Sequence, residues 1–226
     1  MARVRRTGSA RRLVPLRARV AARRRRPPEQ ARLEILEAAE RVFVEFQPDQ
    51  VGLKDVAREA GVSHALVTHY FGTYAGLIEA VFERRIRALR ELMIGRLQEA
   101  GVLARPAELL ATLFDALQDP VHLRLTRWLL ASERPAAAHA FALRDHGLQL
   151  IAHQVANALE PSPSKALIEE VELALMTAVA AAYGYAIGKY ALVGALGRQA
   201  SREMDLAVHR TLAEMLQGYI GSKLAK

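Results

Sequence analysis

Residues 53–71, LKDVAREAGVSHALVTHYF, carry the pattern that decides the fold of this chain. Small and apolar residues stand five, four and one positions before Gly61 and one, six and nine positions after it: Val56, Ala57, Ala60, Val62, Val67 and Tyr70. This spacing lets two short helices cross at a steep angle and bury one shared core. Ala57 allows their backbones to approach, and Gly61 permits the positive φ of a tight turn. The pattern predicts a helix–turn–helix, with a plain helical hairpin as the alternative.

The second helix of this motif has an outward face of short, mostly polar residues. Ser63 is a good N-cap and predicts a helix that ends at Phe71. Such side chains at a helix N-terminus suit entry into the major groove of DNA, where they meet base edges and phosphates. The outward residues are Ser63, His64, Ala65, Thr68 and His69.

Helical periodicity continues on both sides of the motif and no strand alternation interrupts it. Residues 28–46 predict one amphipathic helix before it, and residues 74–97 predict a long one after it. Proline and glycine then separate further helical stretches, which gives an all-α chain of about nine helices. The later predicted helices cover 107–118, 120–132, 136–159, 164–196 and 201–222.

Residues 32–78 resemble the DNA-binding domain of the TetR family. A helix that ends in RVFVEF (residues 41–46) precedes DVAREAGVS (55–63), the recognition helix ends in Tyr70-Phe71, and another helix begins near Tyr74. The resemblance implies a DNA-binding domain over 28–74 and a helical ligand-binding and dimerisation domain over 75–226. It also implies a homodimer formed through roughly 164–222, a near-palindromic double-stranded DNA operator and a small apolar effector.

The resemblance further implies roles for single residues. Lys54 and Tyr74 would contact phosphate at the starts of their helices. His64, Ala65 and Leu66 would face bases, while Thr68, His69 and Tyr70 would meet bases or backbone. Three positions depart from the usual pattern, because Gly52 replaces a Ser or Thr cap, Thr68 a tyrosine and Tyr74 a lysine. Each departure removes or weakens a phosphate contact.

The net charge of +8 is spread very unevenly along the 226 residues. Residues 1–27 hold eleven arginines and no acid, whereas residues 28–74 carry a net charge of −4 and residues 75–226 one of +1. We expect a disordered Arg-rich arm over 1–27 that seeks a polyanion and compensates for the weakened phosphate contacts. An organelle transit peptide is one alternative, and a disordered leader encoded after an upstream start codon that the cell does not use is another. The absence of cysteine fits a reducing cytosol, so we expect a cytoplasmic protein.

The last two predicted helices are apolar enough to pack against other protein helices or to enter a membrane. Residues 173–188 contain no charge and include Gly184-x-x-x-Gly188, which would support helix dimerisation in a membrane but equally close packing in a soluble protein. We favour a buried helix at a dimer interface and no membrane. The final helix carries an apolar seam that suits either a partner helix or the subunit's own core: Val208, Leu212, Met215 and Tyr219.

The remaining candidate sites concern ligands and chemistry. An apolar effector pocket is expected to involve Phe114, Trp128, Met176 and Tyr183, although such residues also fill any helical core. His139, His146 and His153 recur every seven residues, about 10.5 Å apart, which is too far for two of them to share one metal ion. We therefore expect no metal and no cofactor. The chain has no GxSxG, HExxH or Gly-rich phosphate loop, so we do not expect an enzyme. We expect instead a DNA-binding regulator, a homodimeric repressor that a small-molecule effector releases from its operator. An architectural DNA-binding protein or activator without an effector is the alternative function, and a membrane-associated helical protein is a third.

Overall fold

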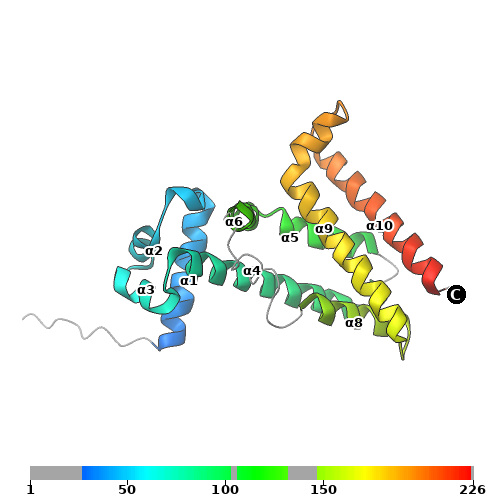
Figure 1. Ribbon diagram of the computed structural model, residues 1–226, viewed down its shortest axis with the longest axis horizontal. Helices are drawn as coiled ribbons and strands as arrows, with labels where there is room; N and C mark the ends of the chain where they lie inside the picture. The colour runs from blue at the N-terminus through cyan, green and yellow to red at the C-terminus, as the bar shows by residue number, and fades with distance from the viewer. Residues whose placement is uncertain (1–26, 103–105, 132–146, 225–226) are drawn as a thin grey trace, which may run out of the picture.

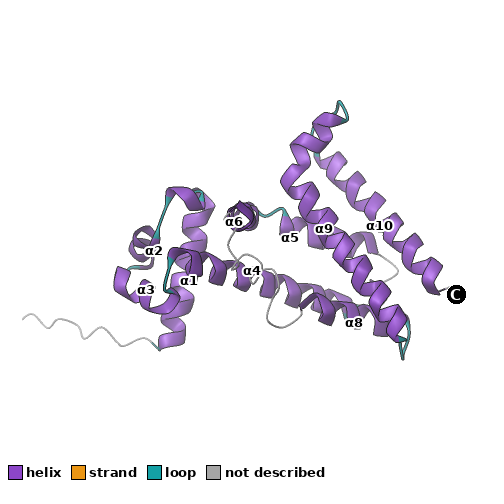
Figure 2. Ribbon diagram, in the orientation of Figure 1, coloured by secondary structure: helices purple, strands orange, loops and turns teal. Residues whose placement is uncertain are grey.

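A computed structural model describes residues 27–102, 106–131 and 147–224. Within these ranges the chain forms nine α-helices and one short 3-10 helix, with no strand (Figure 2). The all-α prediction is therefore confirmed. The predicted helix boundaries agree with the structure to within two residues wherever the chain is described. The first half of the predicted 136–159 helix, the Arg-rich arm, His139 and His146 lie outside the described residues.

The N-terminal helices gather at one end of the molecule (Figure 1). They are α1 (Pro28–Glu45), the 3-10 helix η1 (Pro48–Gln50), α2 (Leu53–Ala60) and α3 (His64–Phe71). The three α-helices among them enclose one apolar core because each contributes apolar residues at helical spacing. Its fully buried members include Ile35, Phe43, Val56 and Val67.

Two glycines make the tight turns of this region possible. Gly61 ends α2 with φ of +64°, in the left-handed region that only glycine adopts without cost, as the sequence predicted. Gly76 lies in the first turn of α4 (Tyr74–Leu97), where a Cβ atom would clash with the carbonyl oxygen of Phe71. Any larger residue at position 76 would therefore push α3 and α4 apart.

Helix α4 runs from the N-terminal core far into the second half of the molecule (Figure 1). Its first half supplies Leu77, Ile78, Val81 and Phe82 to the N-terminal core. Helix α6 (Pro120–Ala131) adds Val121, Leu125 and Leu129 to the same core, although α5 (Pro106–Leu117) before it packs elsewhere. The division of the chain near residue 74 remains a prediction, and α4 and α6 physically bridge it.

The C-terminal helices are α8 (Gly147–Leu159), α9 (Lys165–Ala195) and α10 (Arg202–Leu224). α8 packs against the far half of α4, α9 packs against α8 and α5, and α10 packs against α5 and α9. α9 and α10 lie side by side as a long pair at the end opposite α3 (Figure 1). Two smaller apolar clusters hold them, one between α5, α9 and α10 and one between α8 and α9.

Candidate DNA-binding surface and apolar cavities

The N-terminal half of α3 presents polar groups to solvent. The Ser63 hydroxyl oxygen accepts a 3.2 Å hydrogen bond from the Leu66 backbone N–H, so its own proton remains available to an outside acceptor. His64, Ala65, Thr68 and His69 are exposed, while Val67 on the opposite face is fully buried. The burial of Val67 fixes the rotation of the helix, and this rotation determines which residues face outward. The predicted outward set of α3 therefore lies on one accessible surface.

Other predicted contact residues of α3 are partly used within the protein. The Thr68 hydroxyl donates a 3.1 Å bond to the His64 carbonyl, which leaves only its lone pairs for a partner. Leu66 and Tyr70 are half-buried, and Tyr70 packs against the N-terminal core. The His69 ring meets the Tyr70 ring edge-on at 5.4 Å. The two histidines are consequently the largest freely presented polar groups of α3.

Lys54 and Tyr74 differ in their availability. Lys54 is exposed in the first turn of α2, where the Asp55 carboxylate accepts a 3.0 Å bond from the Gly52 backbone N–H. Asp55 thus makes one half of a capping box, and Gly52 has no side chain to make the other half. The Tyr74 hydroxyl donates a 2.7 Å bond to the Pro48 carbonyl, and burial, followed by the nearby Asp49 and Asp55 charges, raises its pKa. A phosphate contact by Tyr74 would have to replace this internal bond.

An interaction that sequence reasoning missed joins α6 to the end of α1. The Arg124 guanidinium donates hydrogen bonds of 2.6 Å to both the Phe43 and Val44 carbonyls. The ring of Trp128, one turn further along α6, packs edge-on against Tyr74 at 6.2 Å. α6 is therefore attached to the N-terminal core by polar and aromatic contacts as well as by its buried leucines.

The opposite side of α6 contacts α9 through a buried polar pair. His122 Nε2 and the Tyr183 hydroxyl lie 2.9 Å apart, and their rings stack at 5.7 Å. Burial lowers the pKa of His122 to about 4, and the Arg85 guanidinium adds to this effect while Asp119 opposes it. Burial also raises the pKa of Tyr183. Both groups are therefore neutral at pH 7. Through this pair, α6 connects the N-terminal core to α9.

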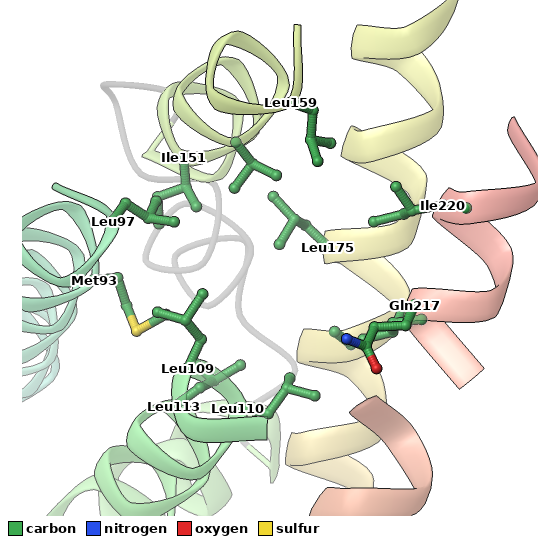
Figure 3. Close-up of a pocket in the computed structure, with 14 residues that line it drawn as sticks. Met93, Leu97, Leu109, Leu110, Leu113, Ile151, Leu159, Leu175, Gln217 and Ile220 are labelled. Atoms are coloured by element: carbon green, nitrogen blue, oxygen red, sulfur yellow. The ribbon is translucent and has the colours of Figure 1, made fainter. Parts of the chain in front are cut away.

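An apolar cavity of about 350 Å³ lies between α4, α5, α8, α9 and α10. Its walls converge from all five helices, with Met93 and Leu97 on α4 opposite Ile220 on α10 (Figure 3). Gln217 is the one side chain of its lining with a hydrogen-bonding group. The other lining residues are Leu109, Leu110, Leu113, Ile151, Val155, Leu159, Leu175, Ala178, Leu216 and Gly221.

A second apolar cavity of about 160 Å³ lies beside the first and includes Tyr183 in its lining. The other three predicted pocket residues line neither of these two cavities. Phe114 is fully buried against His209, with ring centroids 4.0 Å apart, and Trp128 packs on the N-terminal core. Met176 is 54% exposed on α9. Their predicted role in ligand binding has no support from the cavity linings.

The outer faces of α9 and α10 expose many apolar side chains. Tyr190 is 80% exposed and Met215 is 67% exposed, and Gly184 faces solvent with open space around it. By length and composition α9 is also long and apolar enough to cross a membrane, with 33% of its most apolar window buried. Within the described residues, no three His, Cys, Asp or Glu side chains cluster as metal ligands would. Further exposed apolar residues here are Leu173, Ile187, Leu192, Leu196, Leu206 and Tyr219.

Comparison with known proteins agrees with this geometry. A sequence model described as "Bacterial regulatory proteins, tetR family" matches residues 35–81. An uncharacterized HTH-type transcriptional regulator of Mycobacterium tuberculosis H37Rv is 31% identical over 142 residues, which are 60% of this chain and 66% of that protein. The HTH-type transcriptional regulator BetI of Stenotrophomonas maltophilia is 29% identical over 53% of this chain and 66% of its own length. The chain thus spans slightly less than two thirds of these curated relatives.

Solved structures share the fold over most of the chain. A tetR-family transcriptional regulator from Streptomyces coelicolor superposes with a TM-score of 0.62 at 20% identity, covering 86% of this chain and 84% of its own. The fatty acid degradation regulator FadR from Bacillus halodurans gives 0.59 at 16% identity, with 82% and 97% covered. The family model and these relatives identify residues 35–81 as a DNA-binding domain of the TetR family, and the chain as a whole has the all-α fold of TetR-family regulators of known structure.

Proposed function

We propose that this protein is a homodimeric transcriptional repressor that binds a near-palindromic operator and releases it when a small apolar ligand binds. The observation that carries the proposal is the rigid connection of an exposed polar α3 surface to helices that line an apolar cavity. α4 contributes Leu77 and Ile78 to the core beneath α3 and Met93 and Leu97 to the wall of the larger cavity. α4 thus contacts both the N-terminal core beneath α3 and the larger apolar cavity.

The proposed dimer rests on the exposed apolar surface of α9 and α10. Isolated apolar residues are ordinary on protein surfaces, but contiguous exposed patches mark interaction sites. Gly184, with open space around it, lies on this surface and would let a partner helix approach closely. A two-fold dimer would place two copies of α3 roughly 34 Å apart, one turn of DNA, and so would recognise two half-sites in a near-palindrome. The same pairing would cover the apolar surface of α9 in a cytoplasmic protein.

Release by a ligand requires two states that the ligand binds unequally. A ligand that fits the cavity better when α4 and α6 hold the two α3 helices at an unsuitable separation would lower the DNA affinity. The contacts of α6 with α1 and with α9 provide a physical connection for this change.

The proposal is tested by selecting duplexes from a random library with the full chain and titrating the selected sequence at several salt concentrations. We expect one near-palindromic site that is preferred at high salt, and a complex with two chains per duplex. Binding of every duplex with one shared salt dependence would overturn the proposal and support an architectural protein. Partition of the purified chain into detergent micelles through α9 would also overturn it.

A further inference from the structure

The two apolar cavities are neighbours that share part of their walls. Met93, Leu113 and Ile151 line both of them. These three residues come from three different helices, α4, α5 and α8, and lie where the two cavities meet. The Met93 side chain projects toward the space enclosed by α5 and α8 (Figure 3). We refer to these three shared residues as the partition.

The two cavities together follow the axis of α4. The α4 residues that line them lie on one face of the helix, at positions three, four, seven and eleven after the first: Ile86, Leu89, Arg90, Met93 and Leu97. The interval from Ile86 to Leu97 corresponds to about 16 Å of helix. The combined space is therefore long in one direction, and Met93 lies in the middle of it.

The chemistry of the walls is that of a hydrocarbon environment. The larger cavity has Gln217 as the one amide side chain among its aliphatic walls, and the smaller one has Arg90 and Tyr183 among its otherwise apolar lining residues. A ligand buried here would lose the hydration of any polar group without finding a partner for it along most of its length. An elongated, apolar space fits a flexible hydrocarbon chain better than a compact ring system.

We propose that the two cavities are one channel interrupted by the partition, in which Met93 is the side chain that moves, and that the ligand of this channel carries an unbranched aliphatic chain long enough to occupy both cavities. This inference rests on the proposed function, since it names the class of the effector. Methionine is suited to the partition because its unbranched thioether side chain has three rotatable bonds and adapts to irregular space. When the alkyl chain of the ligand enters, the Met93 side chain turns aside. The ligand then lies along the face of α4 that lines both cavities.

The experiment measures the binding of 1-alkanols from hexanol to dodecanol to the full chain by calorimetry. We expect the affinity to rise about fourfold for each added methylene until the alkyl chain fills both cavities, and then to stop rising. Met93→Phe should block the passage with a rigid ring, so that the affinity stops rising at a shorter alkanol. Met93→Ala should keep the wild-type dependence on chain length. Leu92→Phe is the matched control, because Leu92 is 47% exposed on the same helix and lines neither cavity.

Three outcomes would overturn the inference. The first is an affinity that does not increase with chain length, and the second is the same length limit in Met93→Phe as in the wild type. The third is tighter binding of a compact alcohol such as 1-adamantanol than of any linear alkanol. Operator binding without ligand is measured on the same samples. If the protein binds its operator but gives any of these three outcomes, the channel is refuted and the proposed repressor is not. If the wild-type protein binds no operator at all, the proposed repressor itself is refuted.

Discussion

The guanidinium of Arg124 on α6 donates a 2.6 Å hydrogen bond to the carbonyl of Phe43 on α1. α1 ends at Glu45, so this carbonyl belongs to the last turn, whose oxygens lack partners within the helix. The C-terminus of a helix also carries a partial negative charge that a cation stabilises. The last turn of α1 contains no basic residue of its own, and α6 supplies the cation from outside.

Replacing Arg124 with alanine should lower the free energy of unfolding by about 1.5–3 kcal/mol, because two hydrogen bonds to a charged group are lost. Arg127→Ala is the control, since Arg127 lies one turn away on α6 and is exposed. Urea unfolding at pH 7 measures both variants. Equal stability of the two variants would show that the Arg124 contacts contribute nothing beyond those of an ordinary surface arginine.

The helix–turn–helix could be predicted from the sequence because its determinants are local. Val56, Gly61 and Ser63 set burial, turn and cap within a few residues of one another. The Arg124 contact could not be predicted, because 81 residues separate it from Phe43 and the pattern of α6 does not indicate its neighbour. The internal hydrogen bond of Tyr74 to Pro48 could not be predicted for the same reason, since 26 residues separate the partners.

The cavity lining was harder still to predict. Phe114 and Trp128 are apolar and inward-facing as expected, yet they pack tightly against other rings. Whether an inward side chain meets another side chain or empty space depends on the relative position of several helices. Periodicity carries no information about that position.

His122 should make stability depend on pH. Its folded pKa of about 4 lies below its ordinary value of 6.5, so the unfolded chain binds the extra proton more readily. Stability that is fully present above pH 6.5 is therefore lost as the pH falls toward 4. Between pH 7 and pH 5 this group should cost on the order of 2 kcal/mol.

His122→Gln removes this titration while keeping an amide that can bond the Tyr183 hydroxyl. Urea unfolding at pH 7 and pH 5 should show a smaller loss of stability in the variant than in the wild type. Burial also lowers the pKa of His209, and this contribution is common to both proteins and cancels in the difference. Parallel losses in the two proteins would mean that His122 titrates alike in the folded and unfolded chains.

Replacing His64 or His69 with alanine should weaken binding to the selected operator by about 1–3 kcal/mol if the side chain bonds a base edge. Both residues are exposed on α3, so their removal should leave the fold unchanged. Asn157→Ala, at an exposed position of α8, is the control. Fluorescence anisotropy with the labelled operator gives the affinities. Wild-type affinity in both histidine variants would exclude these side chains from the interface.

Gly184→Leu should separate the proposed dimer without unfolding the subunit. A Cβ atom at Gly184 meets nothing within 4 Å in the single chain, so the leucine clashes only with a partner helix. Such overpacking costs about 1–3 kcal/mol of dimerisation free energy, which raises the dimer dissociation constant roughly 5- to 150-fold. Sedimentation over a concentration series measures it, with Gly95→Leu on α4 as a control that is also free of contacts. Equal dissociation constants in the two variants would place the interface elsewhere.

Deleting residues 1–27 should reduce affinity for every duplex while leaving the preferred operator sequence unchanged. These residues carry eleven arginines, whereas residues 28–74 carry a net charge of −4. The surface that holds α3 thus provides few cations of its own for the phosphates. Arginines tethered beside it would neutralise phosphates or enter the adjacent minor groove and release counterions.

The salt dependence of binding decides whether the arm contributes in this way. Each neutralised phosphate changes the slope of log affinity against log salt by about 0.9, so four or five engaged arginines should account for a slope of about 4. The full chain and a chain beginning at Pro28 are titrated with the selected operator and with an unrelated duplex at several salt concentrations. The shorter chain should show the reduced slope on both duplexes, because phosphates carry no sequence information. A loss confined to the operator would instead assign base contacts to the arm, and identical slopes would show that it does not engage DNA.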